Sequence, residues 1–353
     1  MAGGVGTRFW PASTRRRPKQ FLSLVGDGSL LQQSYRRARV LTGAERVVVL
    51  TNADFVDLVR EQLPELAPAN VIGEPARRDT AAAACLAALV ARRRFEDVVM
   101  VMLTADHLIA PASEFARTLL SACSAARGTS ALYTVGIRPE WPATGYGYLE
   151  CGQRSEIDDG VVHRVVSSYR EKPDVATAKA YVDAGSYLWN SGMFVWRASA
   201  ILAAFEEHLP GHVSGLSPVI GALDEGAKTE AFDAAFAGLP AISLDYAVME
   251  KAADVRLVEA TFRWSDLGGW EALAGLLPDD GAGNRHRARI AALDARDNVV
   301  YADGEDELVA LLGVSDLVVV RSAGRTLVAS RGRLEEVKEL VRMLEREGRE
   351  VDL

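Results

Sequence analysis

The sequence predicts an α/β protein whose core is a doubly wound sheet, mixed but mainly parallel, followed by a small β-rich unit at the C-terminus. The first observation is that short runs of β-branched residues alternate with stretches of helical periodicity through most of the chain. The second is that strand-like runs follow one another without helices after about residue 278. A βαβα rhythm places helices on both faces of a sheet, and ligands then bind beyond the carboxyl ends of the strands.

Strands and helices alternate in the first part of the chain. Buried parallel strands are expected at residues 46–51, 70–73 and 97–103, where β-branched and other apolar residues are concentrated. The helices expected between and after them cover residues 29–41, 54–63, 80–93 and 113–127. Ser29 and Ser113 stand at the start of two of these helices and are the expected N-caps.

The rest of the chain divides into a segment in which strands alternate with helices and a segment of strands without helices between them. Strands are expected at residues 131–136, 148–151, 161–171 and 193–196, with helices at 175–184, 198–208 and 230–237. Beyond a glycine-rich linker at residues 281–283, short strands are expected at 289–293, 298–301, 308–313, 317–320 and 326–329, before a charged helix at 334–347. We therefore expect a main domain over residues 1–280 and a small β-rich domain, ending in a helix, over residues 281–353.

The first residues depart from this pattern. A parallel sheet normally leads into its first glycine-rich loop from a strand, yet here the loop begins at Ala2. Either the sheet is built without that strand, or the strand is missing because the sequence starts too late. We favour the late start.

Composition and charge exclude several classes of protein. The net charge of −8 argues against a general nucleic-acid binder. No stretch approaches the roughly 20 apolar residues that span a bilayer, and no secretory signal precedes the first loop, so no membrane association is expected. The three cysteines are odd in number and lack metal-ligand spacing, which favours a reduced, cytoplasmic setting.

The first 26 residues carry the clearest charge signal. They contain five cations and no aspartate or glutamate, in a chain that is acidic overall. Such a segment favours a small polyanionic ligand, and a solvated basic surface is the alternative. The five cations are Arg8, Arg15, Arg16, Arg17 and Lys19.

A glycine-rich loop lies within this segment. Glycines let backbone N–H groups converge on an anion without obstruction by Cβ atoms, and Arg8 can form two hydrogen bonds to phosphate oxygens. No Gly-Lys-Ser/Thr sequence follows, so this is not a Walker loop. Lys19, stiffened by Pro18, adds a point charge suited to an α-phosphate. The candidate nucleotide-binding residues here are Ala2, Gly3, Gly4, Gly6 and Thr7, with Arg8 and Lys19 as the candidate catalytic residues.

Taken together, residues 2–24 (AGGVGTRFWPASTRRRPKQFLSL) resemble the N-terminal signature of the sugar-nucleotide pyrophosphorylases. They are most similar to the mannose-1-phosphate guanylyltransferase branch, in which Trp-Pro follows the arginine and Lys-Gln-Phe-Leu follows later. The resemblance continues through most of the first 280 residues. It implies a Rossmann-like nucleotidyltransferase fold for the main domain.

A second similarity to the family lies at Glu74-Pro75-Ala76-Arg77-Arg78-Asp79-Thr80-Ala81, where a strand leads into a helix. The resemblance implies that Glu74, Arg78 and Thr80 lie along the nucleotide, and free N–H groups at a helix start favour an acceptor or anion. We hypothesise that Glu74 accepts hydrogen bonds from guanine and so discriminates against adenine. The alternative, left open, is that Glu74 pairs with Arg77 or Arg78.

The resemblance also implies a magnesium site. Leu103-Thr104-Ala105-Asp106-His107 is similar to the family's Pro-Ala-Asp-His motif, with threonine in place of proline, and Asp106 corresponds to a metal ligand. Asp266, in a segment similar to Trp-Ser-Asp-Ile/Val-Gly-Ser-Trp, corresponds to the second ligand. Two carboxylates together with phosphate oxygens and waters suit Mg²⁺.

Further motifs resemble those that bind the acceptor sugar. They are Thr144-Gly145-Tyr146-Gly147-Tyr148, Tyr169-Arg170-Glu171-Lys172-Pro173 and the Trp-Asn-Ser-Gly-Met-Phe segment that contains Asn190. The implied contacts are Tyr146, Gly147, Glu171, Lys172 and Asn190. Residues 245–251 are interpreted as a helix that shapes this pocket, with no role assigned to its charges.

The resemblance implies that the chain transfers GMP from GTP to mannose 1-phosphate, giving GDP-mannose and pyrophosphate with the help of Mg²⁺. Two alternatives remain: the same chemistry on another sugar 1-phosphate or nucleotide, and a catalytically silent regulatory subunit that binds sugar nucleotides. The C-terminal unit resembles one that often supports dimerisation, but residues 283–287 depart from the family's apolar pattern and leave a homodimer open.

Overall fold

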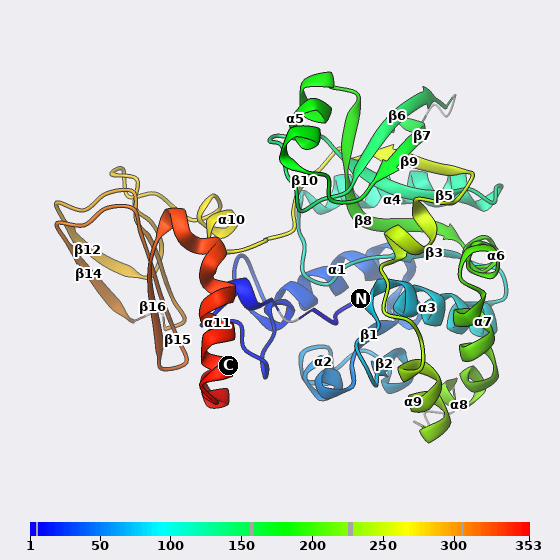
Figure 1. The fold of residues 1–353 in the computed structure, drawn as a ribbon, viewed down its shortest axis with the longest axis horizontal. Coiled ribbons are helices and arrows are strands. Elements are labelled where there is room, and N and C mark those ends of the chain that lie inside the picture. The colour runs from blue at the N-terminus through cyan, green and yellow to red at the C-terminus, as the bar shows by residue number, and fades with distance from the viewer. Residues whose placement is uncertain (5, 156–158, 225–228, 305) are drawn as a thin grey trace. The chain divides into compact units, whose positions relative to one another are not determined.

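The computed structural model describes residues 1–4, 6–155, 159–224, 229–304 and 306–353 (Figure 1). The chain forms two compact units. The first unit comprises Met1–Gly3, Ser34–Ala105 and Ile109–Trp264, and the second comprises Gly4–Gln33, Asp106–Leu108 and Ser265–Leu353. The chain passes between the units after Gly3, within helix α1 (Leu30–Thr42), after Ala105, and within the short strands β4 (Leu108–Ala110) and β10 (Arg263–Ser265).

A mixed six-stranded sheet forms the centre of the first unit, which confirms the expected α/β class. Its order is β3 (Val99–Met102), β8 (Tyr187–Arg197), β5 (Leu132–Ile137), β9 (Val255–Glu259), β7 (His163–Arg170) and β6 (Tyr148–Arg154). Strands β5 and β9 pair in parallel, whereas β8 and β7 run against their neighbours. Strands β3, β5, β9 and β6 therefore share one direction. A separate parallel pair is formed by β1 (Val49–Asn52) and β2 (Val71–Glu74).

Helices fill the connections of the first unit. Three of them, α5 (Val175–Ala184), α6 (Ala198–His208) and α9 (Glu230–Ala237), have the expected bounds. Further helical elements include α2 (Val56–Gln62), α3 (Asp79–Phe95), α4 (Ala112–Arg127), α7 (Pro210–Leu216), α8 (Ile220–Asp224), a π-helical turn at Asp245–Met249 and several 3₁₀ turns. None of the described helices combines the length and the hydropathy that crossing a membrane requires.

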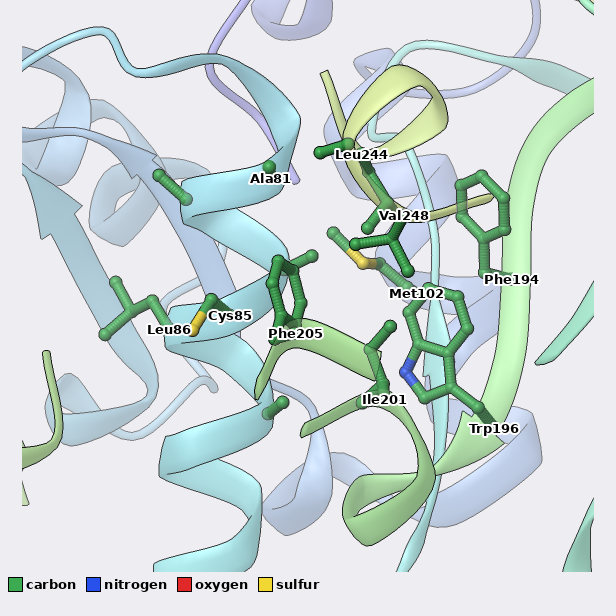
Figure 2. Close-up of a cluster of buried hydrophobic side chains, with 14 of the residues drawn as sticks. Ala81, Cys85, Leu86, Met102, Phe194, Trp196, Ile201, Phe205, Leu244 and Val248 are labelled. Carbon is green, nitrogen blue, oxygen red and sulfur yellow. The ribbon is translucent and has the colours of Figure 1, made fainter. Parts of the chain in front are cut away.

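Side chains that alternate along the central strands build a core on each face of the sheet. Phe194 and Trp196 of β8 join the core that includes α3 and α6, whereas Val195 between them joins the core that includes α4. This alternation follows from the two-residue period of a strand. Figure 2 shows Trp196 facing Ile201 and the neighbouring π-helical turn, and the alanines of α3 leave room for these larger side chains.

The two predicted N-caps have different outcomes. Ser29 caps α1: its hydroxyl accepts from the N–H of Gln32 at 3.1 Å, and the Gln32 side chain accepts from the N–H of Ser29 at 2.9 Å. This reciprocal pair is a capping box with glutamine. The prediction for Ser113 was wrong, because α4 begins at Ala112 with Pro111 as its N-cap. Proline supplies the fixed φ that a helix start accepts, and Ser113 lies exposed in the first turn.

The second unit contains the predicted β-rich segment. Strands β11 (Arg285–Arg287), β13 (Val299–Ala302) and β15 (Leu317–Ser322) stack in parallel, β16 (Arg325–Ser330) pairs antiparallel to β15, and β12 (Arg289–Leu293) pairs in parallel with β14 (Leu308–Leu312). The chain thus alternates between two sheets as it coils. Helices α10 (Trp270–Ala274) and α11 (Val337–Arg346) and the 3₁₀ turns η1 (Thr7–Phe9), η2 (Lys19–Phe21) and η8 (Arg331–Glu336) belong to the same unit.

Two buried asparagines stabilise this coil. The Asn284 side chain donates to the carbonyl of Ala295 at 2.9 Å and accepts from the Asn298 side chain at 2.8 Å. Asn298 in turn accepts from the N–H of Leu317 at 3.0 Å. Because these amides satisfy backbone groups at successive turns, the strands keep their register without an apolar side chain at those positions.

Candidate active site

The glycine-rich loop and Lys19 are built around each other in the second unit. Gly6 has φ +62°, in the left-handed region, and caps the turn η1 that carries Thr7 and Arg8. A Cβ atom on Gly6 would lie 2.4 Å from the Cβ of Lys19 and 3.2 Å from the hydroxyl of Ser13. Glycine is therefore required there both by the backbone conformation and by the lysine packed beside it.

Lys19 occupies a buried position between the two predicted metal-ligand segments. Its side chain is 8% exposed, and Nζ donates to Oδ2 of Asp106 at 3.0 Å and to the backbone carbonyl of Asp266. The amine also lies 5.9 Å from the centre of the Phe9 ring. Three residues that are up to 247 positions apart in the chain thus meet at the amine of Lys19.

The electrostatics favour an ionised carboxylate at Asp106. Burial alone would raise the pKa of Asp106, but the charges of Lys19 and His107 and the hydrogen bond from Lys19 hold this pKa below its ordinary value. The two oxygens of this carboxylate have different neighbours. Oδ2 accepts the hydrogen bond from Lys19, whereas Oδ1 lies 3.9 Å from Nε2 of His107. The sequence assigned no role to His107, although it directly follows the aspartate.

A cavity of about 560 Å³ opens over these residues. Its lining within the second unit includes Gly6, Thr7, Arg8, Lys19, Asp106 and Asp266. Within the described residues no group of three or more histidine, cysteine, aspartate or glutamate side chains gathers to hold a metal. The donor set is instead two carboxylates at an open cavity, which fits Mg²⁺ because this ion commonly completes its shell with phosphate oxygens and waters.

Two other predicted residues of the loop have defined partners. The carbonyl of Gly4 accepts from the Gln20 side chain at 3.0 Å, which ties the loop to the turn η2. Arg8 is half exposed, and its Nε lies 3.3 Å from Oε2 of Glu335, in the turn before α11. The sequence did not predict Glu335 as a neighbour of the loop, because more than 300 residues separate the two.

The remaining candidate nucleotide residues lie in the first unit. The N–H of Ala2 donates to the carbonyl of Leu50 at 2.8 Å, and its carbonyl accepts from Thr51 at 3.0 Å, so Ala2 extends the edge of β1. A Cβ on Gly3 would lie 3.8 Å from Oε2 of Glu74, which ends strand β2. Gly3 and Glu74 are therefore neighbours, as a shared binding role requires.

Glu74 has an unusual environment. Burial raises the pKa of Glu74 to about 7, against the opposing charge of the N-terminal ammonium group. In the described part of the chain Glu74 forms no ion pair with Arg77 or Arg78, and the Arg78 guanidinium donates instead to the carbonyl of Ala237. The structure therefore gives no support to the alternative in which Glu74 is neutralised by these arginines. Thr80 accepts from the N–H of Leu244 at 2.8 Å.

The candidate sugar residues form a second cluster in the first unit. Gly147 lies against Glu171, since a Cβ on Gly147 would approach Oε2 of Glu171 to 2.5 Å. Nζ of Lys172 lies 3.0 Å from Oε1 of Glu171. The ring of Tyr146 packs edge-on against Trp189 and Trp264, at 5.1 and 5.3 Å between ring centres. The predicted residues Tyr146, Gly147, Glu171 and Lys172 therefore belong to one neighbourhood.

Asn190 is embedded in a hydrogen-bond network. Its Oδ1 accepts from Thr134 at 2.7 Å, and its Nδ2 donates to Asp245 at 3.0 Å and to the hydroxyl of Tyr169. Tyr169 also donates to Asp245. The network fixes the orientation of the amide, because both its oxygen and its nitrogen form hydrogen bonds.

Asp245 is the acidic residue that the sequence interpretation left without a role. Burial raises the pKa of Asp245, and burial together with the nearby Asp245 charge raises the pKa of Glu171. Burial alone would lower the pKa of Lys172, but the hydrogen bond and charge of Glu171 raise it overall. A cluster of buried acids beside one lysine suits hydroxyl groups of a sugar, which donate to carboxylates. The signal that could have revealed Asp245 is its position in a segment that resembles the family.

The sequence of this chain is similar to those of known proteins along most of its length. The family model described as "Nucleotidyl transferase" matches residues 1–281, and the one described as "MannoseP isomerase/GMP-like beta-helix domain" matches residues 288–344. The chain is 38% identical to mannose-1-phosphate guanylyltransferase of Escherichia coli K12, over 99% of this chain and 73% of that protein. It is 37% identical to the xanthan biosynthesis protein XanB of Xanthomonas campestris pv. campestris, with the same two shares covered.

A solved structure from Thermus thermophilus, described as mannose-1-phosphate geranyltransferase, is similar over 98% of both chains. The TM-score is 0.84 and the sequence identity is 34%.

Proposed function

The chain belongs to the nucleotidyl transferase family, in the branch of the mannose-1-phosphate guanylyltransferases, and from this premise we propose that it transfers GMP from GTP to α-D-mannose 1-phosphate. The products are GDP-mannose and pyrophosphate. The observation that carries the proposal is the buried amine of Lys19, placed between Asp106 and Asp266 at a cavity lined by the glycine loop.

The chemistry is a displacement at the α-phosphorus of GTP. A phosphate oxygen of the sugar phosphate forms the new P–O bond, and the bond to the leaving pyrophosphate breaks, in line. Since the attacking phosphate is already an anion at neutral pH, no general base is needed. The barrier lies in bringing two anions together, so positioning and neutralisation of charge supply most of the catalysis.

The residues of the second unit act on the triphosphate. Lys19 offsets charge at the α-phosphate, and Arg8 with the N–H groups of the glycine loop holds the β- and γ-phosphates. Asp106 and Asp266 would hold Mg²⁺, which supplies further positive charge to the phosphate oxygens. The low pKa of Asp106 supports this role because a metal ligand must be ionised at working pH.

The residues of the first unit recognise the two organic groups. Glu74 accepts hydrogen bonds from the ring N–H and amino group of guanine, with Gly3 beside it allowing close approach of the base. Lys172 holds the phosphate of the acceptor, while Glu171 grips a sugar hydroxyl. Asn190, whose amide is fixed by its own network, presents a rigid surface to the sugar.

An assay of pyrophosphate release tests the proposal. Purified protein is incubated with each of GTP, ATP, UTP and dTTP, combined with mannose, glucose and N-acetylglucosamine 1-phosphates, with Mg²⁺ and with EDTA. We expect release above background with GTP and mannose 1-phosphate, and none in EDTA. Preference for another pair would assign the same chemistry to other substrates, whereas folded protein that leaves every nucleotide intact would identify a silent subunit and overturn the proposal.

A further inference from the structure

The C-terminal helix α11 forms one wall of the cavity that contains Lys19. Lys338, Val341, Arg342 and Glu345 all line this cavity, and their spacing places them on one face of the helix. The helix packs against the turn η1 that holds Arg8, and Figure 1 shows α11 running beside the N-terminal segment of the same unit. Residues of the C-terminal helix therefore line the same cavity as Lys19.

The positive charge on this wall has little compensation. Lys338 is half-buried, and within the described residues its side-chain ammonium group has neither an ion pair nor a hydrogen bond. Arg342 is exposed and pairs with Glu339 on its own helix, at 2.8 Å. The acid that also lines the wall, Glu345, is already neutralised by Arg15 at 2.7 Å. A partly desolvated ammonium group without a partner favours an anion beside it.

At the floor of the cavity, carboxylates offset the positive charge of the lysine. Lys19 is matched there by the carboxylate of Asp106, and the carboxylate of Asp266 adds further negative charge. A triphosphate that reaches this floor with its α-phosphate extends two more phosphates, which need cations elsewhere. Arg8 supplies one, although its guanidinium also pairs with Glu335, and among the described residues that line the cavity α11 adds the unpaired ammonium group of Lys338.

We propose that Lys338, assisted by Arg342, binds the terminal phosphates of the nucleoside triphosphate and the pyrophosphate that leaves. This inference rests on the proposed function for the identity of the nucleotide, but its chemistry requires only a polyphosphate anion. It makes the C-terminal helix a supplier of binding groups to the active site. Lysine suits this task as a mobile point charge that can follow the departing group.

Steady-state kinetics of Lys338→Ala and Lys338→Gln test the inference, with Lys338→Arg as the conservative variant. Arg346→Ala is the matched control, because Arg346 is an exposed cation on the same helix and does not line the cavity. We expect the KM for GTP and the inhibition constant for pyrophosphate to rise about tenfold in the Ala and Gln variants, since both lose a charge-assisted contact to the terminal phosphates. The KM for mannose 1-phosphate should stay within about twofold, and the Arg variant should recover most of the loss.

Calorimetric titration with inorganic tripolyphosphate separates this inference from the proposed function. The probe needs no sugar and no turnover, and weaker binding by Lys338→Gln than by wild type and Arg346→Ala supports the inference even if GTP proves to be the wrong nucleotide. Equal binding of tripolyphosphate by wild type and a folded Lys338→Gln variant, together with an unchanged KM for GTP, would overturn it. Circular dichroism establishes that each variant is folded.

Discussion

A single side chain, Lys19, connects the segments that carry the chemistry. Its amine donates to Asp106 and to the carbonyl of Asp266, and its Cβ fills the space that a side chain on Gly6 would need. Because the lysine is buried and already oriented, little reorganisation is required when negative charge accumulates nearby. Preorganised charge of this kind is usually the largest single contribution to catalysis.

Replacing Lys19 with alanine should lower kcat by about 10²–10³-fold, as expected for the loss of a preorganised charge at the reacting phosphate. The measurement is pyrophosphate release at saturating GTP. Lys179→Ala, which changes an exposed lysine of α5 outside the cavity lining, is the control and should retain activity. A loss below tenfold in Lys19→Ala would show that another group is the central cation.

Gly6→Ala should destabilise the protein by about 1–3 kcal/mol, because alanine is strained at φ +62° and its Cβ collides with Lys19. The matched variant is Gly4→Ala, since a Cβ there meets nothing within 4 Å and the φ of Gly4 is not positive. Urea unfolding of both variants checks the difference. Equal midpoints would mean that the loop rearranges at no cost.

Glu74 should give the protein a pH-dependent stability. Because burial raises its pKa from 4.5 to about 7, the folded state holds this proton more tightly than the unfolded state, and stability falls as the pH rises from about 4.5 to 7. Glu74→Gln removes this effect, so it should stabilise the protein at pH 8 by on the order of 1–3 kcal/mol and by much less at pH 5. Urea unfolding at both pH values measures it, and a difference that does not change with pH would contradict the assignment.

The same glutamate should also control selectivity. If its carboxylate accepts from guanine, Glu74→Gln replaces one acceptor with a donor and should reduce the preference for GTP over ATP. Unchanged relative kcat/KM values for the two nucleotides would remove Glu74 from base recognition while leaving its effect on stability intact.

At the scale of elements, the start of α1 depends on a local side-chain pair. Ser29→Ala breaks the reciprocal bonds with Gln32 and should cost about 1 kcal/mol. Ser113→Ala should cost much less, because Ser113 lies in the exposed first turn of α4 and does not cap it. Thermal unfolding compares the two variants, and equal shifts would show that the capping box contributes nothing measurable.

The sequence predicted several helices closely, but it placed only residues 193–196 of the long strand β8 (Tyr187–Arg197). Helices α5, α6 and α9 have the expected bounds because their periodicity extends over two turns or more and their ends carry clear signals, such as Asp174 and Thr229 as N-caps. The short elements β4, β9, β10, α7, α8 and α10 were missed. Their three to seven residues carry too little pattern to identify, and neighbouring elements specify them instead.

The same distinction holds for the site. Motifs revealed Lys19, Asp106 and Asp266 because each lies in a dense local signature. Lys338 and Glu335 carry no such signature, since an amphipathic charged helix indicates packing and solvent exposure but not which loop it covers. Their place at the cavity depends on the tertiary fold and could not be deduced from spacing along the chain.

At the scale of the molecule, the second unit depends on its last residues. Trp10 donates from its indole to the carbonyl of Asp352 at 2.8 Å, and Trp270 donates to the carbonyl of Trp10 at 3.0 Å. Arg15 pairs with Glu345. The apolar side of α11, with Val337, Val341 and Leu344, shares one core with Phe9 and Trp10. The C-terminal helix thus packs against the residues that directly follow the glycine-rich loop.

A chain ending at Ser330 should therefore lose both stability and activity. Removing residues 331–353 uncovers Trp10 and deletes the wall of the cavity, so we expect a lower midpoint of thermal unfolding, a red-shifted tryptophan emission and a KM for GTP raised by at least tenfold. A shorter deletion after Gly348, which keeps α11 but removes the bond to Asp352, is the matched comparison. Full activity of the longer deletion would show that the loop holds its shape unaided.

The second unit is assembled from stretches of chain that are made at different times during translation. Its three stretches of chain include residues near both ends, and Arg15 meets its partner Glu345 across 330 positions. During translation the glycine-rich loop is made long before the helix that supports it, because Arg15 and Glu345 are 330 residues apart. A nascent chain that still lacks α11 therefore has an unfinished cavity, because this helix supplies part of the lining.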